Sequence, residues 1–344
     1  MLLVLLLPEL RVVAQSTTIL NFNGTNGNTP YYGALVNDGT YLYGTTSLGG
    51  TNGAGNVFKI KPDGSGYVDL LDFTGTTSNG GHPYGSLFYD GTFLYGMTQN
   101  GGVGFYGTIF KIKPDGTGYL KLYDFSGSDG QYPYGSLVSD GTYLYGMTSQ
   151  GGANNLGEVF KIKFDGTGFA KLVDFSGSNG KVPYGSLYYD GVYLYGMTAQ
   201  GGAISSGIIF KMKTDGTGFA DIFDFGVTNG SYPTGDLVSD GTYLYGMTNQ
   251  GGAHSMGVAF RIKPDGTSFL KLFDFAGPSN GSYPYGSFLF NGGLLFGLTS
   301  QGGTSGYGLA FKILPDGTGY TKLLDFSGSA NGSNPYGSMI TDGT

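Results

Sequence analysis

Residues 185–225 decide the fold; they read GSLYYDGVYLYGMTAQGGAISSGIIFKMKTDGTGFADIFDF. Apolar and aromatic side chains alternate in this stretch with a period of two residues, which is typical of strands. Asp-Gly pairs and a Gly-Gly pair separate the alternating runs and predict turns. We expect strands, in chain order, over residues 185–189, 193–198, 208–213 and 219–225. No segment shows a 3.6-residue period, so almost no helix is expected.

This unit recurs along the chain. The motif Pro-Tyr-Gly-Ser-Leu, or a close variant, has its glycine at positions 33, 85, 135, 185, 235, 286 and 337, which are 50 to 52 residues apart. Four short strands in a repeat of about 50 residues are typical of a propeller blade. Both faces of the strands are apolar, as Tyr119 and Tyr123 opposite Leu120 illustrate, and a blade between two neighbours requires this. The sequence predicts an all-β fold, a β-propeller with six complete four-stranded antiparallel blades.

The two ends of the chain match parts of a further copy. Residues 17–22 match a fourth strand, and residues 337–344 match a first strand and its turn. A ring is closed when strands from both ends share one blade, which removes exposed sheet edges. Here that blade lacks its two middle strands. We therefore predict a single propeller domain over residues 16–344 with an incomplete seventh blade, and a full protein with at least about 30 further residues.

The first 15 residues are similar to a secretory leader. Met1–Leu7 form an apolar run, and Val12-Val13-Ala14 supply small residues for cleavage after Ala14. The run lacks a preceding basic segment, so we expect the true start to lie upstream. It is also shorter than the roughly 20 apolar residues that a membrane span needs. We expect an exported protein, extracellular or at the cell surface.

Composition restricts the class of partner. The chain of 344 residues has 68 Gly, 28 Tyr and 25 Phe, so it has large side chains to bury. Charged residues are only 12% and the net charge is −7, which argues against nucleic acid. There is no Cys, so no disulfide framework supports the fold. A polysaccharide or another surface protein is the expected partner, and we expect the chain to be monomeric.

The connections between strands alternate in length. A tight Asp-Gly turn follows the first strand, a long Gly-Gly loop the second, a tight Asp-Gly-Thr-Gly turn the third, and a long connection such as residues 176–183 the fourth. Successive turns of a meander lie on opposite edges, so all long loops share one face. This long-loop face is the candidate binding surface, because function concentrates on loops that a rigid scaffold holds.

Most aspartates are expected to be structural. Asp before Gly is favoured hairpin chemistry, since Gly accepts positive φ and Asp bonds its own backbone. The first-turn aspartates are Asp38, Asp90, Asp140, Asp190, Asp240 and Asp342, and the second-turn aspartates are Asp63, Asp115, Asp165, Asp215, Asp265 and Asp316. Six more precede a Phe and are expected to accept N–H bonds at a strand end: Asp72, Asp124, Asp174, Asp224, Asp274 and Asp325. One cation per blade is the alternative, but no denser carboxylate cluster supports it, and we expect no metal and no cofactor.

Repeated planar and aromatic side chains on the long-loop face suit sugars. A Tyr precedes the first-strand glycine at Tyr84, Tyr134, Tyr184, Tyr285 and Tyr336, and a Gln precedes the Gly-Gly pair at Gln150, Gln200, Gln250 and Gln301. Several weak sites of this kind would act with avidity. Asp236, which replaces Ser in the fifth copy, is a further candidate near the channel mouth. The simpler alternative is that each Tyr packs between blades, each Gln caps a turn and Asp236 reflects drift in one repeat.

Groups for catalysis are scarce. The chain has two His, His82 and His254, in long connections that are not adjacent, and two such residues cannot make a zinc site. No arrangement of Ser, His and acid is implied. We therefore expect a non-catalytic protein with no catalytic residues. The alternative is a polysaccharide hydrolase or lyase that uses His82, His254 or Glu158 on the same face.

Two runs carry a family resemblance. Leu42–Gly50 reads LYGTTSLGG and Val57–Gly66 reads VFKIKPDGSG, and both closely resemble the GloVer (Gloeo-Verruco) tandem repeat. All six complete copies match. The resemblance implies secreted bacterial proteins that form propellers and are often followed by a C-terminal sorting or anchoring signal, with no established enzymatic activity. No such signal lies within residues 1–344, which fits the expectation that the full protein continues beyond Thr344. Asn291-Gly292-Gly293 also replaces Asp-Gly-Thr in the sixth copy.

Overall fold

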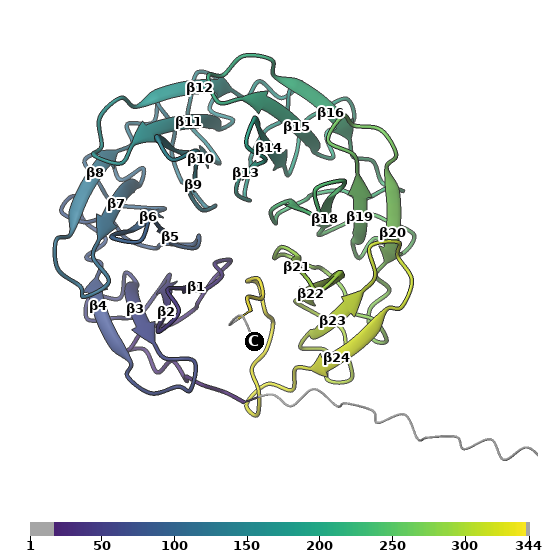
Figure 1. Cartoon of the computed structure of the whole chain (residues 1–344), viewed down its shortest axis with the longest axis horizontal. Helices are drawn as coiled ribbons and strands as arrows, with labels where there is room; N and C mark the ends of the chain where they lie inside the picture. The colour runs from purple at the N-terminus through teal and green to yellow at the C-terminus, as the bar shows by residue number, and fades with distance from the viewer. Residues whose placement is uncertain (1–16, 342–344) are drawn as a thin grey trace, which may run out of the picture.

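The computed structural model of the protein describes residues 17–341. They form six four-stranded antiparallel sheets arranged around a central axis (Figure 1). Each sheet is one blade, and its four strands are hydrogen-bonded in sequence order from the axis outwards. The predicted all-β propeller with six complete blades is confirmed. No helix occurs within residues 17–341, and so none there could cross a membrane.

The strands have closely similar bounds in all blades. Blade 1 comprises β1 (Val36–Asn37), β2 (Leu42–Thr46), β3 (Asn56–Ile60) and β4 (Val68–Asp72), and blade 2 comprises β5 (Phe88–Tyr89), β6 (Leu94–Thr98), β7 (Thr108–Ile112) and β8 (Leu120–Asp124). Blade 3 comprises β9 (Val138–Ser139), β10 (Tyr143–Thr148), β11 (Glu158–Lys163) and β12 (Ala170–Asp174), and blade 4 comprises β13 (Tyr188–Tyr189), β14 (Tyr193–Thr198), β15 (Ile208–Lys213) and β16 (Ala220–Asp224). Blade 5 comprises β17 (Val238–Ser239), β18 (Leu244–Thr248), β19 (Val258–Ile262) and β20 (Leu270–Asp274), and blade 6 comprises β21 (Leu289–Asn291), β22 (Leu294–Thr299), β23 (Leu309–Ile313) and β24 (Thr321–Asp325).

The innermost strand of each blade is shorter than predicted. In blade 4 the strand over residues 185–189 is reduced to Tyr188–Tyr189, because Gly185 and Ser186 contact the neighbouring copies of the motif at the axis. A Cβ on Gly185 would lie 2.3 Å from the carbonyl oxygen of Gly235, so only glycine permits this approach. The residue after each of the first six glycines donates its N–H to the next copy, as Ser136 does to Ser186 Oγ at 2.8 Å. We call these glycines and the residues that follow them the axial ring.

The axial ring contains seven pairs of residues, one glycine and the residue after it from each copy of the motif. Ser287 donates its N–H to Ser338 Oγ at 2.7 Å, so the seventh copy of the motif continues the same ladder. A Cβ on Gly337 would lie 2.7 Å from the carbonyl oxygen of Gly33, which brings the last member next to the first. Six complete blades therefore surround an axis whose innermost layer contains seven copies of the motif.

The hydrophobic core lies between blades. In the core between blades 3 and 4, Tyr145 and Met147 of blade 3 pack against Leu194 and Phe210 of blade 4, and all are at most 2% exposed. The strand-interior Gly196 lies opposite Phe210 of its own blade, and a Cβ there would be 2.5 Å from the Phe210 ring. Each blade thus buries one face against the preceding blade and the other against the following blade.

The aspartates hold the turns and the loops. Asp140 accepts N–H bonds from Thr142 and Tyr143 and the hydroxyl of Tyr145 at 2.7 Å, and Asp38, Asp90, Asp190 and Asp240 accept equivalent bonds. In the second turn, Asp165 accepts both the N–H and the hydroxyl of Thr167; Asp63, Asp115, Asp215, Asp265 and Asp316 accept the same pair of bonds. Asp174, before the Phe, accepts the N–H of Ala153 at 2.7 Å and so joins strand β12 to the Gly-Gly loop.

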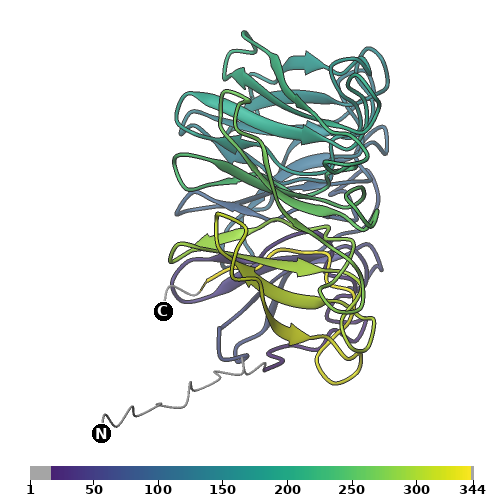
Figure 2. The ribbon, with the colours of Figure 1, turned by 90° about the vertical axis from the view of Figure 1, so that its right-hand side faces the viewer.

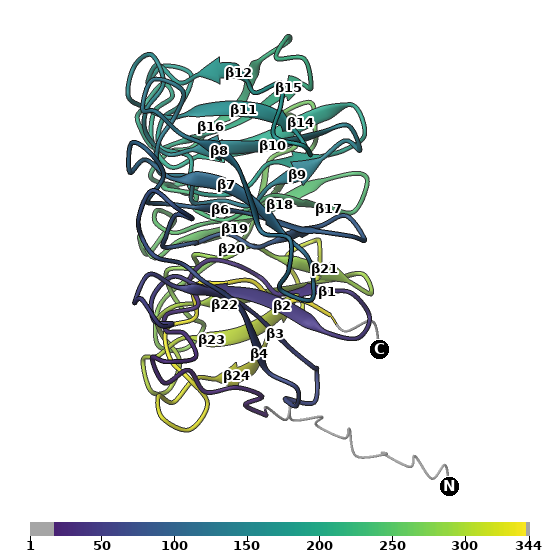
Figure 3. The ribbon, with the colours of Figure 1, turned by 90° about the vertical axis from the view of Figure 1, so that its left-hand side faces the viewer.

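The long loops and the tight turns lie on opposite faces of the disc (Figures 2 and 3). The C-terminal segment reaches the axis between blades 6 and 1 and leaves towards the tight-turn face (Figures 1 and 2). Neither residues 17–22 nor residues 337–341 form a strand, because no strand of the described chain is hydrogen-bonded beside them. The predicted leader, residues 1–15, and Asp342 lie outside the described residues.

Candidate functional site

Tyrosines gather around the axis at the long-loop face. The ring of Tyr134 lies 4.9 Å from that of Tyr84 and 5.0 Å from that of Tyr184, measured between centroids. The ring of Tyr336 lies 4.6 Å from Tyr285 and is stacked on Tyr31 at 4.7 Å. We call this set the tyrosine collar; its members are Tyr31, Tyr32, Tyr84, Tyr134, Tyr184, Tyr285 and Tyr336. The structure therefore brings together the tyrosines that the repeat singled out.

Tyr32 fills the centre of the collar. Its ring centroid lies 6.1 Å from that of Tyr84, 6.5 Å from Tyr134 and 6.0 Å from Tyr285. Its backbone φ is 48°, a left-handed conformation that non-glycine residues adopt rarely. The first copy reads Pro-Tyr-Tyr-Gly where the others have one residue between Pro and Gly, so Tyr32 is an insertion. The sequence signal for it was the three-residue step from Pro30 to Gly33, where Pro83 and Gly85 are two residues apart.

Burial favours the neutral form of six of the seven collar tyrosines. It raises the pKa of Tyr31 to about 12, with a further contribution from the neighbouring Tyr336. Burial also raises the pKa values of Tyr32, Tyr84 and Tyr134 above the ordinary value. All seven collar side chains remain partly exposed. The collar is therefore a neutral aromatic surface at physiological pH.

The channel below the collar is nearly closed. A cavity of about 20 Å³ lies between the collar and the axial ring, which is room for about one water molecule. A second cavity of about 260 Å³ lies on the other side of the ring, lined by serines of the ring and by first-strand residues such as Val138 and Val238. The collar therefore has little free volume beneath it, between its rings and the axial ring.

Asp236 lies in the axial ring and not at the channel mouth. Its carboxylate accepts the N–H of Ser186 at 2.5 Å, and its own N–H is donated to Ser287 Oγ at 2.7 Å. Burial raises its pKa, while the bonds from Ser186 oppose that shift. The carboxylate thus takes the place of a serine hydroxyl in the ladder. The expectation of a position at the mouth was wrong, because a residue directly after the glycine points into the ring.

The recurring glutamines lie further from the axis. Gln150, Gln200, Gln250 and Gln301 stand in the loops between second and third strands and pair through their backbones with Gln131, Lys181, Ser231 and Ser282. The residue before this position is closer to the collar: Gln99 donates from Nε2 to the hydroxyl of Tyr134. Sequence reasoning missed Gln99, because the second copy reads Gln-Asn where the third to sixth copies have Ser-Gln, Ala-Gln or Asn-Gln.

The three residues considered for catalysis lie in different parts of the ring. His82 precedes blade 2, and its Nδ1 lies 2.8 Å from the carbonyl oxygen of Ser47. His254 is exposed in the loop between β18 and β19. Glu158 is fully buried in β11, neither carboxylate oxygen has a hydrogen-bond partner among the described residues, and burial raises its pKa to about 8. Within residues 17–341, no group of three His, Asp or Glu residues is arranged to hold a metal ion.

Known proteins resemble the chain in sequence pattern and in fold. The model of the Gloeobacter/Verrucomicrobia repeat matches residues 9–194 and again residues 190–344. No curated protein sequence matches the chain. Among solved structures, one of a nidogen/laminin complex is 15% identical, covering 87% of this chain and 96% of that one, with a TM-score of 0.55.

Two further solved structures are similar to the same degree. An oligogalacturonate lyase from Vibrio parahaemolyticus is 13% identical, covering 90% of this chain and 81% of that one, with a TM-score of 0.57. A putative 6-phosphogluconolactonase from Bacteroides uniformis is 14% identical, covering 94% and 89%, with a TM-score of 0.53. At these identities the similarity concerns the fold alone.

Proposed function

Because the chain belongs to the Gloeobacter/Verrucomicrobia repeat family and carries an aromatic collar at one end of its axis, we propose that it is a non-catalytic, exported protein that binds a neutral polysaccharide through the long-loop face. The observation that carries the proposal is the tyrosine collar. Its rings are partly exposed, close together and uncharged. Aromatic side chains with a polar tip offer an apolar face and a hydrogen-bonding group at once, which suits the two kinds of surface on a sugar.

The geometry of the collar supports binding without a large entropic cost. The Tyr31 and Tyr336 rings are stacked, and Tyr134 and Tyr184 meet edge to face at an interplanar angle of 87°. Side chains that already contact one another lose little rotamer freedom when a ligand arrives. The acidic net charge of −7 and the neutral collar favour an uncharged glycan over an acidic one.

The proposed location and the absence of catalysis depend on different observations. Residues 1–15 have the pattern of a secretory leader, which supports an extracellular or cell-surface protein. His82, His254 and Glu158 lie in separate parts of the ring, and Glu158 is buried, which supports a non-catalytic role. We further propose that the protein acts as a monomer.

A finer architectural proposal accompanies the function. Residues 17–22 and 337–341 form the outer and the inner strand position of an incomplete seventh blade. The ladder bond from Ser287 to Ser338 supports the inner position. The edge-to-face contact of Phe22 with Phe58, at 5.4 Å and 69°, supports the outer position, because a Phe of each preceding blade makes this contact in the complete interfaces.

Binding to an array of neutral polysaccharides, followed by titration calorimetry, tests the proposal. We expect a double variant, Tyr84→Ala with Tyr134→Ala, to lose at least about tenfold in affinity through the lost ring contacts. Tyr307→Ala is the matched control, since Tyr307 is 44% exposed on a long loop of blade 6 outside the collar. Absence of binding to every polysaccharide contradicts the proposal. Turnover that disappears in a His82→Ala, His254→Ala variant would establish the enzymatic alternative instead.

A further inference from the structure

The space between blades 6 and 1, which we call the open sector, has apolar walls that lack a complete neighbour among the described residues. In blade 5, Tyr245 and Met247 face blade 6 and are 0% and 2% exposed. The corresponding residues of blade 6, Phe296 and Leu298, face the open sector and remain partly exposed. The same sheet face is therefore buried in one interface and partly uncovered in the other.

The inner edge of the open sector is already formed. Residues 337–341 follow the axial ring in the place where every other copy begins its first strand, and a Cβ on Gly286 would lie 2.2 Å from the carbonyl oxygen of Gly337. The corresponding approach of Gly185 to Gly235 is 2.3 Å. The inner segment thus has the position of a first strand relative to blade 6.

The outer edge is formed as well. The rings of Phe22 and Phe58 meet at 5.4 Å and 69°, and those of Phe175 and Phe210, between blades 3 and 4, meet at 5.6 Å and 66°. A Cβ on Gly64 would lie 2.8 Å from the carbonyl oxygen of Ile19, as one on Gly166 would lie 2.9 Å from that of Leu122. Residues 17–22 therefore stand where a fourth strand packs on the following blade.

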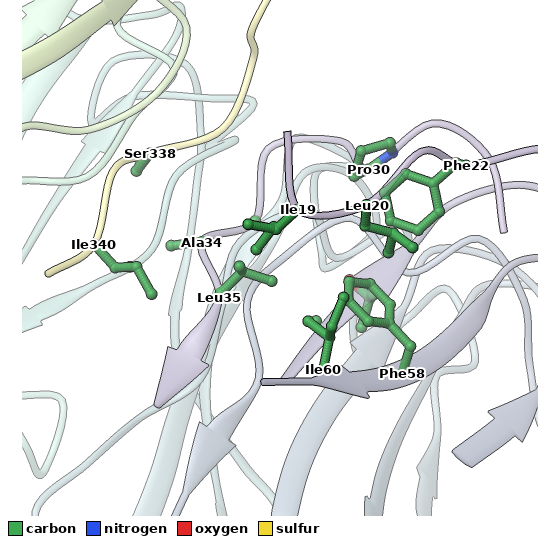
Figure 4. Close-up of a pocket in the computed structure, with 13 residues that line it drawn as sticks. Ile19, Leu20, Phe22, Pro30, Ala34, Leu35, Phe58, Ile60, Ser338 and Ile340 are labelled. Carbon is green, nitrogen blue, oxygen red and sulfur yellow. The ribbon is translucent and has the colours of Figure 1, made fainter. Parts of the chain in front are cut away.

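Two apolar cavities lie between these edges. One of about 260 Å³ is lined by Leu20, Leu35, Phe58 and Ile340 among others, and Figure 4 shows Ile340 projecting from the C-terminal segment towards the blade 1 side chains. The other, of about 510 Å³, reaches Leu289 and Phe296 of blade 6. The groove is bounded by a first-strand position and a fourth-strand position, so the missing layer is that of the second and third strands.

We propose that the groove receives a β-hairpin with the sequence pattern of the second and third strands of this repeat. Such a hairpin has two different apolar faces. In blade 4, Leu194 and Phe210 face the preceding blade, and Tyr195 and Met197 face the following one. The hairpin places the first pair of side chains on blade 6 and the second pair on blade 1. Its backbone extends the sheet from both edges, which is recognition by strand addition.

The chemistry of the groove favours this occupant over others. Its walls are aliphatic and aromatic, so the hydroxyl groups of a sugar find few partners there. A second copy of the chain presents the same open sector and not the missing layer. The proposal rests on the incomplete seventh blade and is independent of glycan binding by the collar, so either can fail alone.

A peptide with the sequence of residues 192–213, VYLYGMTAQGGAISSGIIFKMK, tests the proposal on the full chain. Fluorescence anisotropy of the labelled peptide is expected to show saturable one-to-one binding, and the midpoint of thermal unfolding of the chain is expected to rise with peptide concentration. A control peptide with Tyr195→Ser, Met197→Ser and Phe210→Ser keeps the sequence of the turn and lacks large apolar side chains from both faces of the hairpin. It is expected not to bind.

Variants of the chain locate the peptide. Ile340→Asp and, separately, Leu20→Asp charge the groove and are expected to weaken peptide binding at least about tenfold. Val192→Asp, at a side chain that is 61% exposed on a tight turn of blade 4, is the matched control and is expected to leave binding unchanged. Circular dichroism establishes that each variant is folded. A folded chain that does not bind the peptide, or binds it equally well with Ile340→Asp and Leu20→Asp, overturns the proposal. So does a dimer, seen by sedimentation, that both groove variants dissociate.

Discussion

The interface between blades 3 and 4 and the open sector between blades 6 and 1 are built from the same repeat and differ in burial. In the first, Tyr145 and Met147 are at most 2% exposed because Leu194 and Phe210 cover them. In the second, Phe296 and Leu298 occupy the equivalent positions and are only partly buried. Each blade thus has two apolar faces, and it can bury neither of them without a neighbouring blade. The interfaces between blades therefore contribute most of the stability, and a complete interface is expected to contribute more than an incomplete one.

The largest difference is expected for the phenylalanine that ends the fourth strand. Phe175→Ala empties a site that is 0% exposed, and such truncations cost about 3–5 kcal/mol. Phe22→Ala removes a ring with the same edge-to-face geometry at a half-buried site, where we expect about 1–2 kcal/mol. Urea denaturation of the two variants measures both free energies of unfolding. Equal costs would mean that the open sector is as well packed as the complete interface.

A buried acid is expected to make blade 3 sensitive to pH. Burial raises the pKa of Glu158 to about 8, whereas Ile208 and Val258 stand at this position in blades 4 and 5. The folded state holds the proton after the unfolded chain has released it, so this contribution to stability is complete at low pH and is lost as pH rises to about 8. The slope is about 1.4 kcal/mol per pH unit.

Comparison with Glu158→Gln from pH 6 to pH 8 isolates this effect, because Asp221 and Asp236, whose pKa values burial also raises, are present in both chains. In this window the wild-type chain is expected to lose stability relative to Glu158→Gln, in which no proton is released at this position. Denaturation at several pH values measures the difference between the two. Parallel pH profiles would show that Glu158 is ionised in the folded state.

The smallest expected effect concerns the closure of the axial ring. Ala34 stands where the following copies have Ser or Asp, so it offers no hydroxyl to the N–H of Ser338. Ala34→Ser supplies one and is expected to stabilise the fold by about 0.5–1.5 kcal/mol. Ser186→Ala removes the acceptor of the Ser136 N–H and is expected to cost a similar amount. Thermal unfolding measures both; a destabilising Ala34→Ser would place Ser338 out of register with the ring.

Local patterns in the sequence predicted most of the fold. Strands β14 and β15 have the predicted bounds, Tyr193–Thr198 and Ile208–Lys213. Both signals that predicted them, the two-residue alternation and the turn residues, are local in the sequence. The short first strands were not foreseen. Their length is set by contacts such as that of Ser136 with Ser186, which join successive copies and leave no local signature.

The candidate site was predictable in part. Repetition singled out Tyr84, Tyr134 and Tyr184, and the structure places them around one axis. Repetition could not single out Tyr32, because an insertion in one copy is by definition not repeated. It also misjudged Asp236, since the direction of a side chain beside the axial glycine depends on the neighbouring copy. The binding of a glycan by these residues stays a prediction.

The repeats stack around an axis, and this closure brings the last copy of the motif back to the first. A disulfide between Ala34→Cys and Ser338→Cys tests it, because the natural chain has no Cys and both positions line the same cavity in the open sector. Oxidation of dilute protein, followed by mass spectrometry, is expected to give an intramolecular cross-link. The control pair Ala34→Cys with Val192→Cys, whose second position is exposed on a tight turn of blade 4, is expected to give none. A folded 34/338 variant that forms no cross-link, or only links between molecules, would contradict the closed ring.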